Sequence, residues 1–172
     1  MELELHSDCS KCAALCCVAF SFDSRASFGI DKEAEEPCPN LDECGGCKIY
    51  GRREEEGFIG CLTYDCHGAG QRVTQEMFGG QSWLSDTALL KPMCEAMAVM
   101  RRLHEVLAMA QSAKTLPIDD SDQKALAALL EEGTFDSSQM AFEDLYFRVM
   151  DLETRTRSLL KSFSKYGAGL NG

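Results

Sequence analysis

Apolar residues recur at helical spacing through the second half of the chain. From about residue 85 to residue 113 they step by four and by three along a single stripe, formed by Leu89, Met93, Ala96, Met100, Leu103, Leu107 and Ala110. Ser85 or Asp86 is suited to cap the start of this segment, and Pro92 marks either its first turn or a kink. The pattern predicts one long amphipathic helix.

Two more helices are predicted after it. The segment "SDQKALAALLEEG" begins at a cap formed by Ser121 or a nearby aspartate and stops at Gly133. The last helix, over about 137–166, has the most regular stripe, formed by Phe142, Leu145, Val149, Leu152, Thr156, Leu159, Phe163 and Tyr166. We expect the three stripes to face each other in an antiparallel bundle. The alternative is that the last stripe binds a protein partner or a second copy in a homodimer.

Residues 1–80 lack a long helical period. Segments such as "EEPCPNLDECGGCKIYG" and "DCHGAGQ" are rich in the residues of tight turns. We therefore predict a mainly α protein, in which a loop-rich, cysteine-rich, metal-organised unit over residues 1–80 packs on a helical bundle of about three helices over residues 81–172. The two parts are expected to form one compact structural unit.

The formal net charge of −11 argues against binding to nucleic acid or to an anionic membrane surface. The first residues, "MELELHSDC", have no basic region followed by a long apolar run, so no signal peptide is expected. No apolar run reaches the length of a membrane span. These features favour the cytoplasm, where cysteine clusters more often serve metal binding or catalysis than disulfides.

Nine of the ten cysteines lie between residues 9 and 66. Cys9 and Cys12 form one CxxC motif, Cys44 and Cys47 form a second, and Cys16 is followed directly by Cys17. Paired CxxC motifs are typical of zinc and iron–sulfur sites. If residues 9–16 were helical, Cys9, Cys12 and Cys16 would share one face while Cys17 pointed elsewhere. The pattern favours two metal centres or one cluster, and redox cysteines or inert core cysteines are the alternatives.

Zinc and iron, including an iron–sulfur cluster, both accept an all-thiolate shell, so the ligands do not choose between them. An iron–sulfur redox or electron-transfer protein is therefore an alternative to a structural, storage or sensing role. Copper(I) is a weaker alternative: Met93, Met97, Met100 and His104 lie on one helical face beside Cys94. Methionines in that pattern more often fill a bundle core.

The segments "CSKCAALCC", "PCPNLDECGGCKIYGR" and "GCLTYDC" resemble the bacterial CxxCxxCC family of zinc- or iron-chelating domains. A nearer likeness, through "LCCVAF", "GFIGCLTYDCHGAGQRVTQ" and "MRRLHEVL", is to the N-terminal cysteine-rich module of some bacterial pentapeptide-repeat proteins, although no such repeats follow here. The resemblance covers residues 9 to about 107. It implies bound zinc or iron, with the ligands Cys9, Cys12, Cys16, Cys17, Cys38, Cys47, Cys61 and Cys66. Three residues, rather than two, precede the Cys16–Cys17 pair.

Cys44 and His67 are further candidate ligands outside this motif, although a histidine in a glycine-rich turn is more often simply solvated. No G-x-S-x-G, Walker or HExxH motif occurs in the chain. A catalytic pair of Cys66 with His67 or His104 has no supporting signature, so an enzyme is the less favoured interpretation.

Overall fold

The computed structural model describes residues 3–167 and is mainly helical, which confirms the predicted fold class. The helices are α1 (Leu15–Ala19), α2 (Ile59–Thr63), α3 (Ala69–Arg72), α4 (Leu90–Ala113), α5 (Asp120–Glu132), α6 (Phe142–Ser162) and α7 (Ser164–Gly167). A π-helical turn over Val73–Met77 continues α3, and 3-10 turns lie at Cys9–Lys11, Tyr50–Arg52 and Thr87–Leu89. Within the described range, none of these helices has both the length and the apolar content that crossing a membrane requires.

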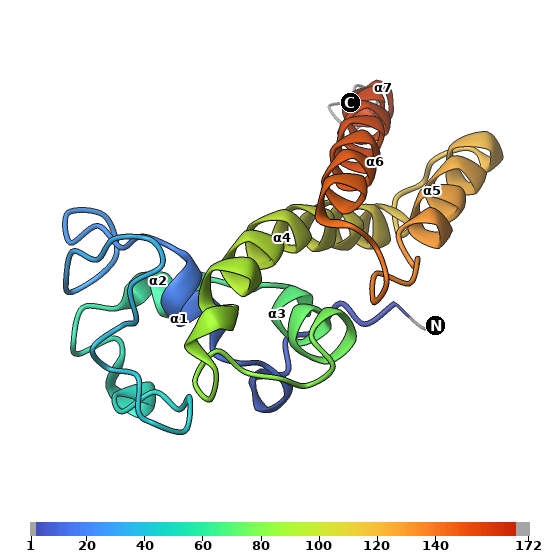
Figure 1. Ribbon diagram of the computed structural model, residues 1–172. Coiled ribbons are helices and arrows are strands. Elements are labelled where there is room, and N and C mark those ends of the chain that lie inside the picture. Colours follow the sequence, from blue (N-terminus) through green and yellow to red (C-terminus); the bar gives the residue numbers. More distant parts are fainter. Residues whose placement is uncertain (1–2, 168–172) are drawn as a thin grey trace.

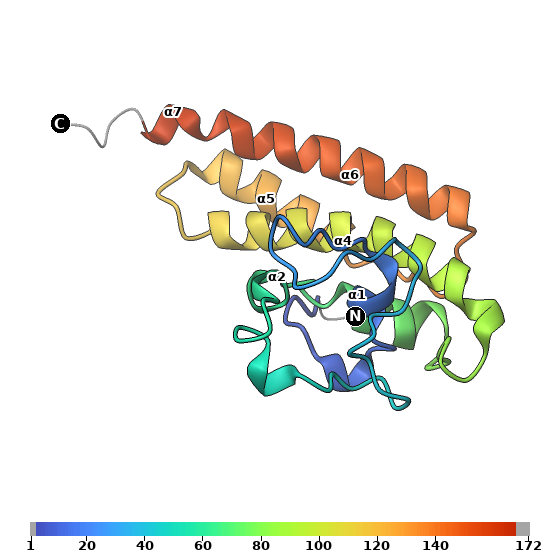
Figure 2. The ribbon, with the colours of Figure 1, turned by 90° about the vertical axis from the view of Figure 1, so that its left-hand side faces the viewer.

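The predicted three-helix bundle is present. Helices α4, α5 and α6 pack against one another and lie one above the other in Figure 2, with the cysteine-rich loops below α4. Six of the seven apolar positions predicted for the long helix are at most 1% exposed, namely Met93, Ala96, Met100, Leu103, Leu107 and Ala110. The apolar stripe of α4 therefore forms the centre of the bundle core.

Helix α4 is also buried on the side that faces the first half of the chain. Helices α1 and α3 pack against it in the lower part of Figure 1. Leu15 and Val18 of α1, together with Ala69 and Val73, join the same apolar core as the bundle. Cys94 and Met97, which lie outside the predicted stripe, are buried as part of this shared core. The short helices of the cysteine-rich half are thus held on α4 by ordinary burial of apolar side chains.

Most helices of the bundle begin and end where the sequence predicts, but the last helix begins later than expected. Asp86 caps the turn that leads into α4, because its Oδ1 accepts from the Ala88 backbone N–H at 3.0 Å. Asp119 caps α5, and Gly133 follows its last residue. The prediction that the last helix begins near residue 137 is wrong, since α6 begins at Phe142. The backbone N–H and the hydroxyl of Ser137 both donate to Glu76, at 2.6 Å each, and this tertiary bond keeps the segment out of the helix.

The stripe of α6 is buried mostly inside the chain itself. Leu145, Val149 and Thr156 are fully buried, whereas Phe142, at its start, is 39% exposed. Intramolecular packing therefore accounts for the regular spacing of this stripe. Binding of a partner or of a second copy through this helix stays a prediction.

Candidate metal centre

The first of two thiol groups, the loop group, consists of Cys9, Cys12, Cys16 and Cys66. All four are free thiols. Burial raises the pKa of Cys9, and the neighbouring Cys16 and Cys66 raise it further. Burial likewise raises the pKa of Cys12 to about 11, and the other three members of the group add to the shift. The thiols lie close enough that ionisation of one opposes ionisation of the others, although Cys66 is far from the other three along the chain.

The second group, the aromatic group, consists of Cys17, Cys38, Cys47 and Cys61. These side chains belong to a small apolar cluster, separate from the main core, that is built on Phe22, Ile49 and Phe58. Burial raises the pKa of Cys61 to about 11, with smaller contributions from Cys16, Cys38 and Cys47. The backbone N–H of Cys38 donates to the carbonyl of Cys17 at 2.9 Å, which ties two cysteines of the group together.

The two groups meet at the Cys16–Cys17 step, where the Sγ atoms are 3.9 Å apart. The contact with Cys17 and burial both raise the pKa of Cys16 well above its ordinary value. Residues 9–16 do not form one helix, so the condition under which Cys9, Cys12 and Cys16 would share a helical face is not met. The 3-10 turn ends before Cys12, and Ala14 has a φ of +53° immediately before α1. This left-handed residue separates the CxxC turn from α1, which carries Cys16 and Cys17.

Side chains from outside the motif hold the backbone of the CxxC loop. Gln71 accepts from the Asp8 N–H, Thr74 Oγ1 accepts from the Ala13 N–H at 3.0 Å, and Gln75 Nε2 donates to the Lys11 carbonyl at 2.8 Å. The indole N–H of Trp83 donates to the Ala13 carbonyl at 2.7 Å. These four residues were not predicted as part of the site. Nothing in their spacing indicates that their side chains reach a loop more than 60 residues earlier.

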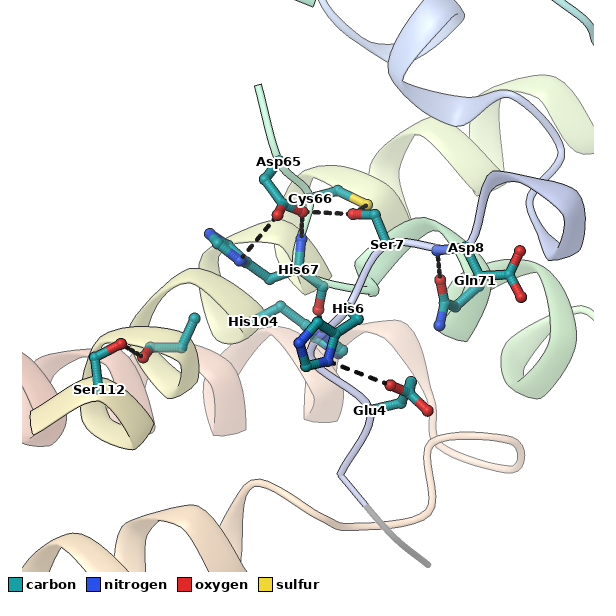
Figure 3. Close-up of polar contacts among 11 residues, drawn as sticks. Glu4, His6, Ser7, Asp8, Asp65, Cys66, His67, Gln71, His104 and Ser112 are labelled. Atoms are coloured by element: carbon teal, nitrogen blue, oxygen red, sulfur yellow. Dashed lines mark hydrogen bonds and ion pairs between the residues drawn. The ribbon is translucent and has the colours of Figure 1, made fainter. Parts of the chain in front are cut away.

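Cys66 lies in a turn that is fixed from both sides. The Ser7 hydroxyl donates to Asp65 and lies 3.1 Å from Cys66 Sγ, as Figure 3 shows. The next residue, His67, has a φ of +49°, and its carbonyl lies 2.6 Å from Nδ1 of His104 on α4. A carbonyl only accepts, so Nδ1 of His104 carries the proton and donates it. The long helix thereby positions the Cys66 turn.

Glycine at position 70 makes room for two thiols of the loop group. A Cβ at Gly70 would lie 2.6 Å from Cys12 Sγ and 3.9 Å from Cys66 Sγ. The first distance is far below van der Waals contact. Any other residue at this position of α3 would displace the Cys12 thiol.

The thiols approach one another without reaching ligand geometry. Over residues 3–167, no three histidine, cysteine, aspartate or glutamate side chains are arranged so that they could hold a metal ion. Closure of either group around an ion would therefore require its thiols to move together.

The other candidate ligands have surroundings of their own. Cys44 is exposed at the tip of a turn that is closed by the Asp42 carboxylate, which accepts from the backbone N–H groups of Cys44 and Gly46. The His67 ring faces Asp65, with 3.7 Å between Nδ1 and Oδ2. The residues of the copper(I) alternative are buried in the main core or on its edge, namely Met93, Met97, Met100, His104 and Cys94.

Comparison with known proteins gives one distant likeness. A stretch of 107 residues, 62% of this chain, is 37% identical to a curated Bacillus subtilis protein called "Uncharacterized protein YybG". The match spans 38% of that protein's length. No family model and no solved structure matches the chain.

Proposed function

We propose that this protein binds metal ions, zinc or iron, through cysteine thiolates. The observation that carries the proposal is that free thiols from separate segments of the chain lie near one another. The Sγ atoms of Cys16 and Cys17 are 3.9 Å apart, and those of Cys12 and Cys66 both border Gly70. Four thiolates form the usual complete shell of a structural zinc site and of an iron–sulfur cluster. Eight cysteines are also the ligands that the resemblance to the zinc- or iron-chelating family implies.

The electrostatics of the thiols favour a cation. Burial and neighbouring thiols raise the pKa of Cys9, Cys12, Cys16 and Cys61, so a metal-free chain would hold these groups as neutral thiols at pH 7. A bound cation reverses that balance, because it stabilises the thiolates that the apolar surroundings otherwise oppose. The space beside Gly70 fits this donor set, since the sulfur atoms of Cys12 and Cys66 border it.

Elemental analysis of the purified native protein, combined with its absorption spectrum, tests the proposal. We expect one or two equivalents of zinc or iron per chain, and a release of protons when metal is added to the metal-free protein. Colourless protein with zinc identifies a zinc site. Brown protein that bleaches on reduction identifies an iron–sulfur cluster and the electron-transfer alternative. Protein that carries neither metal, and takes up neither under reducing conditions, contradicts the proposal.

Replacement of Gly70 by alanine should weaken metal binding while the chain stays folded. The new methyl group displaces Cys12 Sγ, and we expect the affinity at the loop group to fall by about 10- to 100-fold, the usual effect of disturbing a ligand's support. The measurement is competition with a chelator of known affinity. The matched control is Gly51→Ala, because a Cβ at Gly51 meets no atom within 4 Å. Equal affinities for the two variants would contradict the expected role of Gly70.

A further inference from the structure

The two thiol groups differ in their surroundings. Cys9 of the loop group is exposed and Cys38 of the aromatic group is buried, whereas the other three thiols of each group are partly buried. Phe22 stacks on Phe28 with ring centroids 4.2 Å apart and meets Phe58 edge to face, and Phe22 and Phe58 belong to the same apolar cluster as Cys38. An incoming ligand can therefore reach Cys9 from solvent but must displace packed side chains to reach Cys38.

A buried lysine, Lys32, lies beside the aromatic group. Lys32 is 6% exposed, and its Nζ lies 4.8 Å from the centre of the Phe22 ring. The ammonium donates to the carbonyls of Val18, Glu33 and Glu36. Among the ion pairs within residues 3–167, none involves Lys32. Burial of an ammonium group is costly unless negative charge lies nearby.

Glu36 lies near Lys32, and thiolates would add to its negative charge. Cys38 and Cys17 also lie near enough to Lys32 to influence its ionisation. Four thiolates around a divalent cation carry a net charge of about −2, which a buried lysine partly neutralises. The fixed position of Lys32 therefore fits an anionic tetrathiolate centre in the aromatic group.

The two groups also differ in how much their loops would need a bound metal ion to stay folded. The loop group's CxxC backbone is held by Gln71, Thr74, Gln75 and Trp83, and Cys66 by its own turn. The aromatic group closes a long segment, residues 22–61, whose apolar cluster contains only four buried residues. Such a small cluster stabilises a loop-rich segment poorly without a staple.

We propose that the two groups are separate metal sites with different roles. The aromatic group holds a structural ion, with Lys32 as its counter-charge, and the loop group holds an ion that exchanges with solvent ligands. This assignment rests on the proposed function and deepens it.

The test follows the release of zinc from the zinc-loaded full chain to a chromogenic chelator. Two phases of one equivalent each are expected. Cys9→Ser should change the fast phase alone, and Lys32→Met should speed the slow phase by about tenfold without changing the fast one. Gly51→Ala, at an exposed position where an added Cβ meets no atom within 4 Å, serves as the control and should leave both phases unchanged.

Limited trypsin digestion of the unmodified protein provides a second measurement that does not depend on the folding of any variant. Cleavage after Lys32, which is 6% exposed while the segment is folded, should begin with the slow phase and not with the fast one. A single equivalent, a single phase, or an equal effect of Cys9→Ser and Lys32→Met on the same phase would overturn the assignment while leaving metal binding intact. Failure to bind zinc or iron at all would instead overturn the proposed function.

Discussion

Replacing Leu107 with alanine is expected to lower the free energy of unfolding by about 2–5 kcal/mol, the usual cost of a large cavity in a packed core. Leu107 is fully buried on α4. Its Cδ atoms lie so close to Gly133, at the end of α5, that a Cβ there would be 2.6 Å away. The side chain therefore fills the contact between two helices, and neighbouring atoms have little freedom to close the space it leaves. Urea denaturation followed by circular dichroism measures the change.

Leu116→Ala is the matched control. Leu116 is 46% exposed, so its truncation should change stability by no more than about 0.5 kcal/mol. If both variants lost less than 1 kcal/mol, the contact between α4 and α5 could not be as tightly packed as the structure has it.

Acid should destabilise the metal-free protein between pH 6.5 and pH 4 through His104. Burial lowers the pKa of His104 from its ordinary value of 6.5 to about 4, with smaller effects from Arg72, His67 and Glu76. Below pH 6.5 the unfolded chain therefore binds a proton that the folded chain does not bind until about pH 4. The contribution of His104 to the free energy of unfolding is therefore complete above pH 6.5. It falls as the pH drops, by about 3 kcal/mol in total.

The test compares pH profiles of unfolding for the wild type and His104→Asn. Asparagine cannot titrate, yet its amide can donate to the His67 carbonyl in place of Nδ1. We expect the variant to be less stable at pH 7 but to lose less stability on acidification. His6→Asn is the control, because nearly all of the His6 side chain is exposed. Parallel profiles for the wild type and His104→Asn would show that His104 does not carry this acid sensitivity.

The helices of the second half were predictable because their information is local. Helical spacing predicted α4 and the apolar face of α6. Gly133 and the capping aspartates predicted where helices of the bundle begin and end. The start of α6 was not predictable, because a bond between Glu76 and Ser137 joins residues 61 positions apart. Burial of the second face of α4 could not be predicted either, because it depends on which part of the chain packs against that face.

The resemblance to the CxxCxxCC family implies eight cysteine ligands, and the CxxC spacing favours two metal centres or one cluster. How the thiols lie relative to one another could not be predicted. Their arrangement depends on the left-handed Ala14, which lies between the CxxC motif and α1, and on the apolar cluster that includes Cys38. Gly70 and Lys32 carried no recognisable signal, because their roles depend on distances between segments that are remote along the chain.

The amino-acid sequence by itself determined the helical class, the three-helix bundle and the choice of cysteine as the candidate ligand. These properties follow from side-chain chemistry and from spacing within a few turns of chain. Only the tertiary structure decided which thiols lie together, which are exposed, and which side chains support them. Those features depend on how the loops pack against α3 and α4. Such packing brings together residues that are far apart in the sequence, so spacing along the chain does not reveal it.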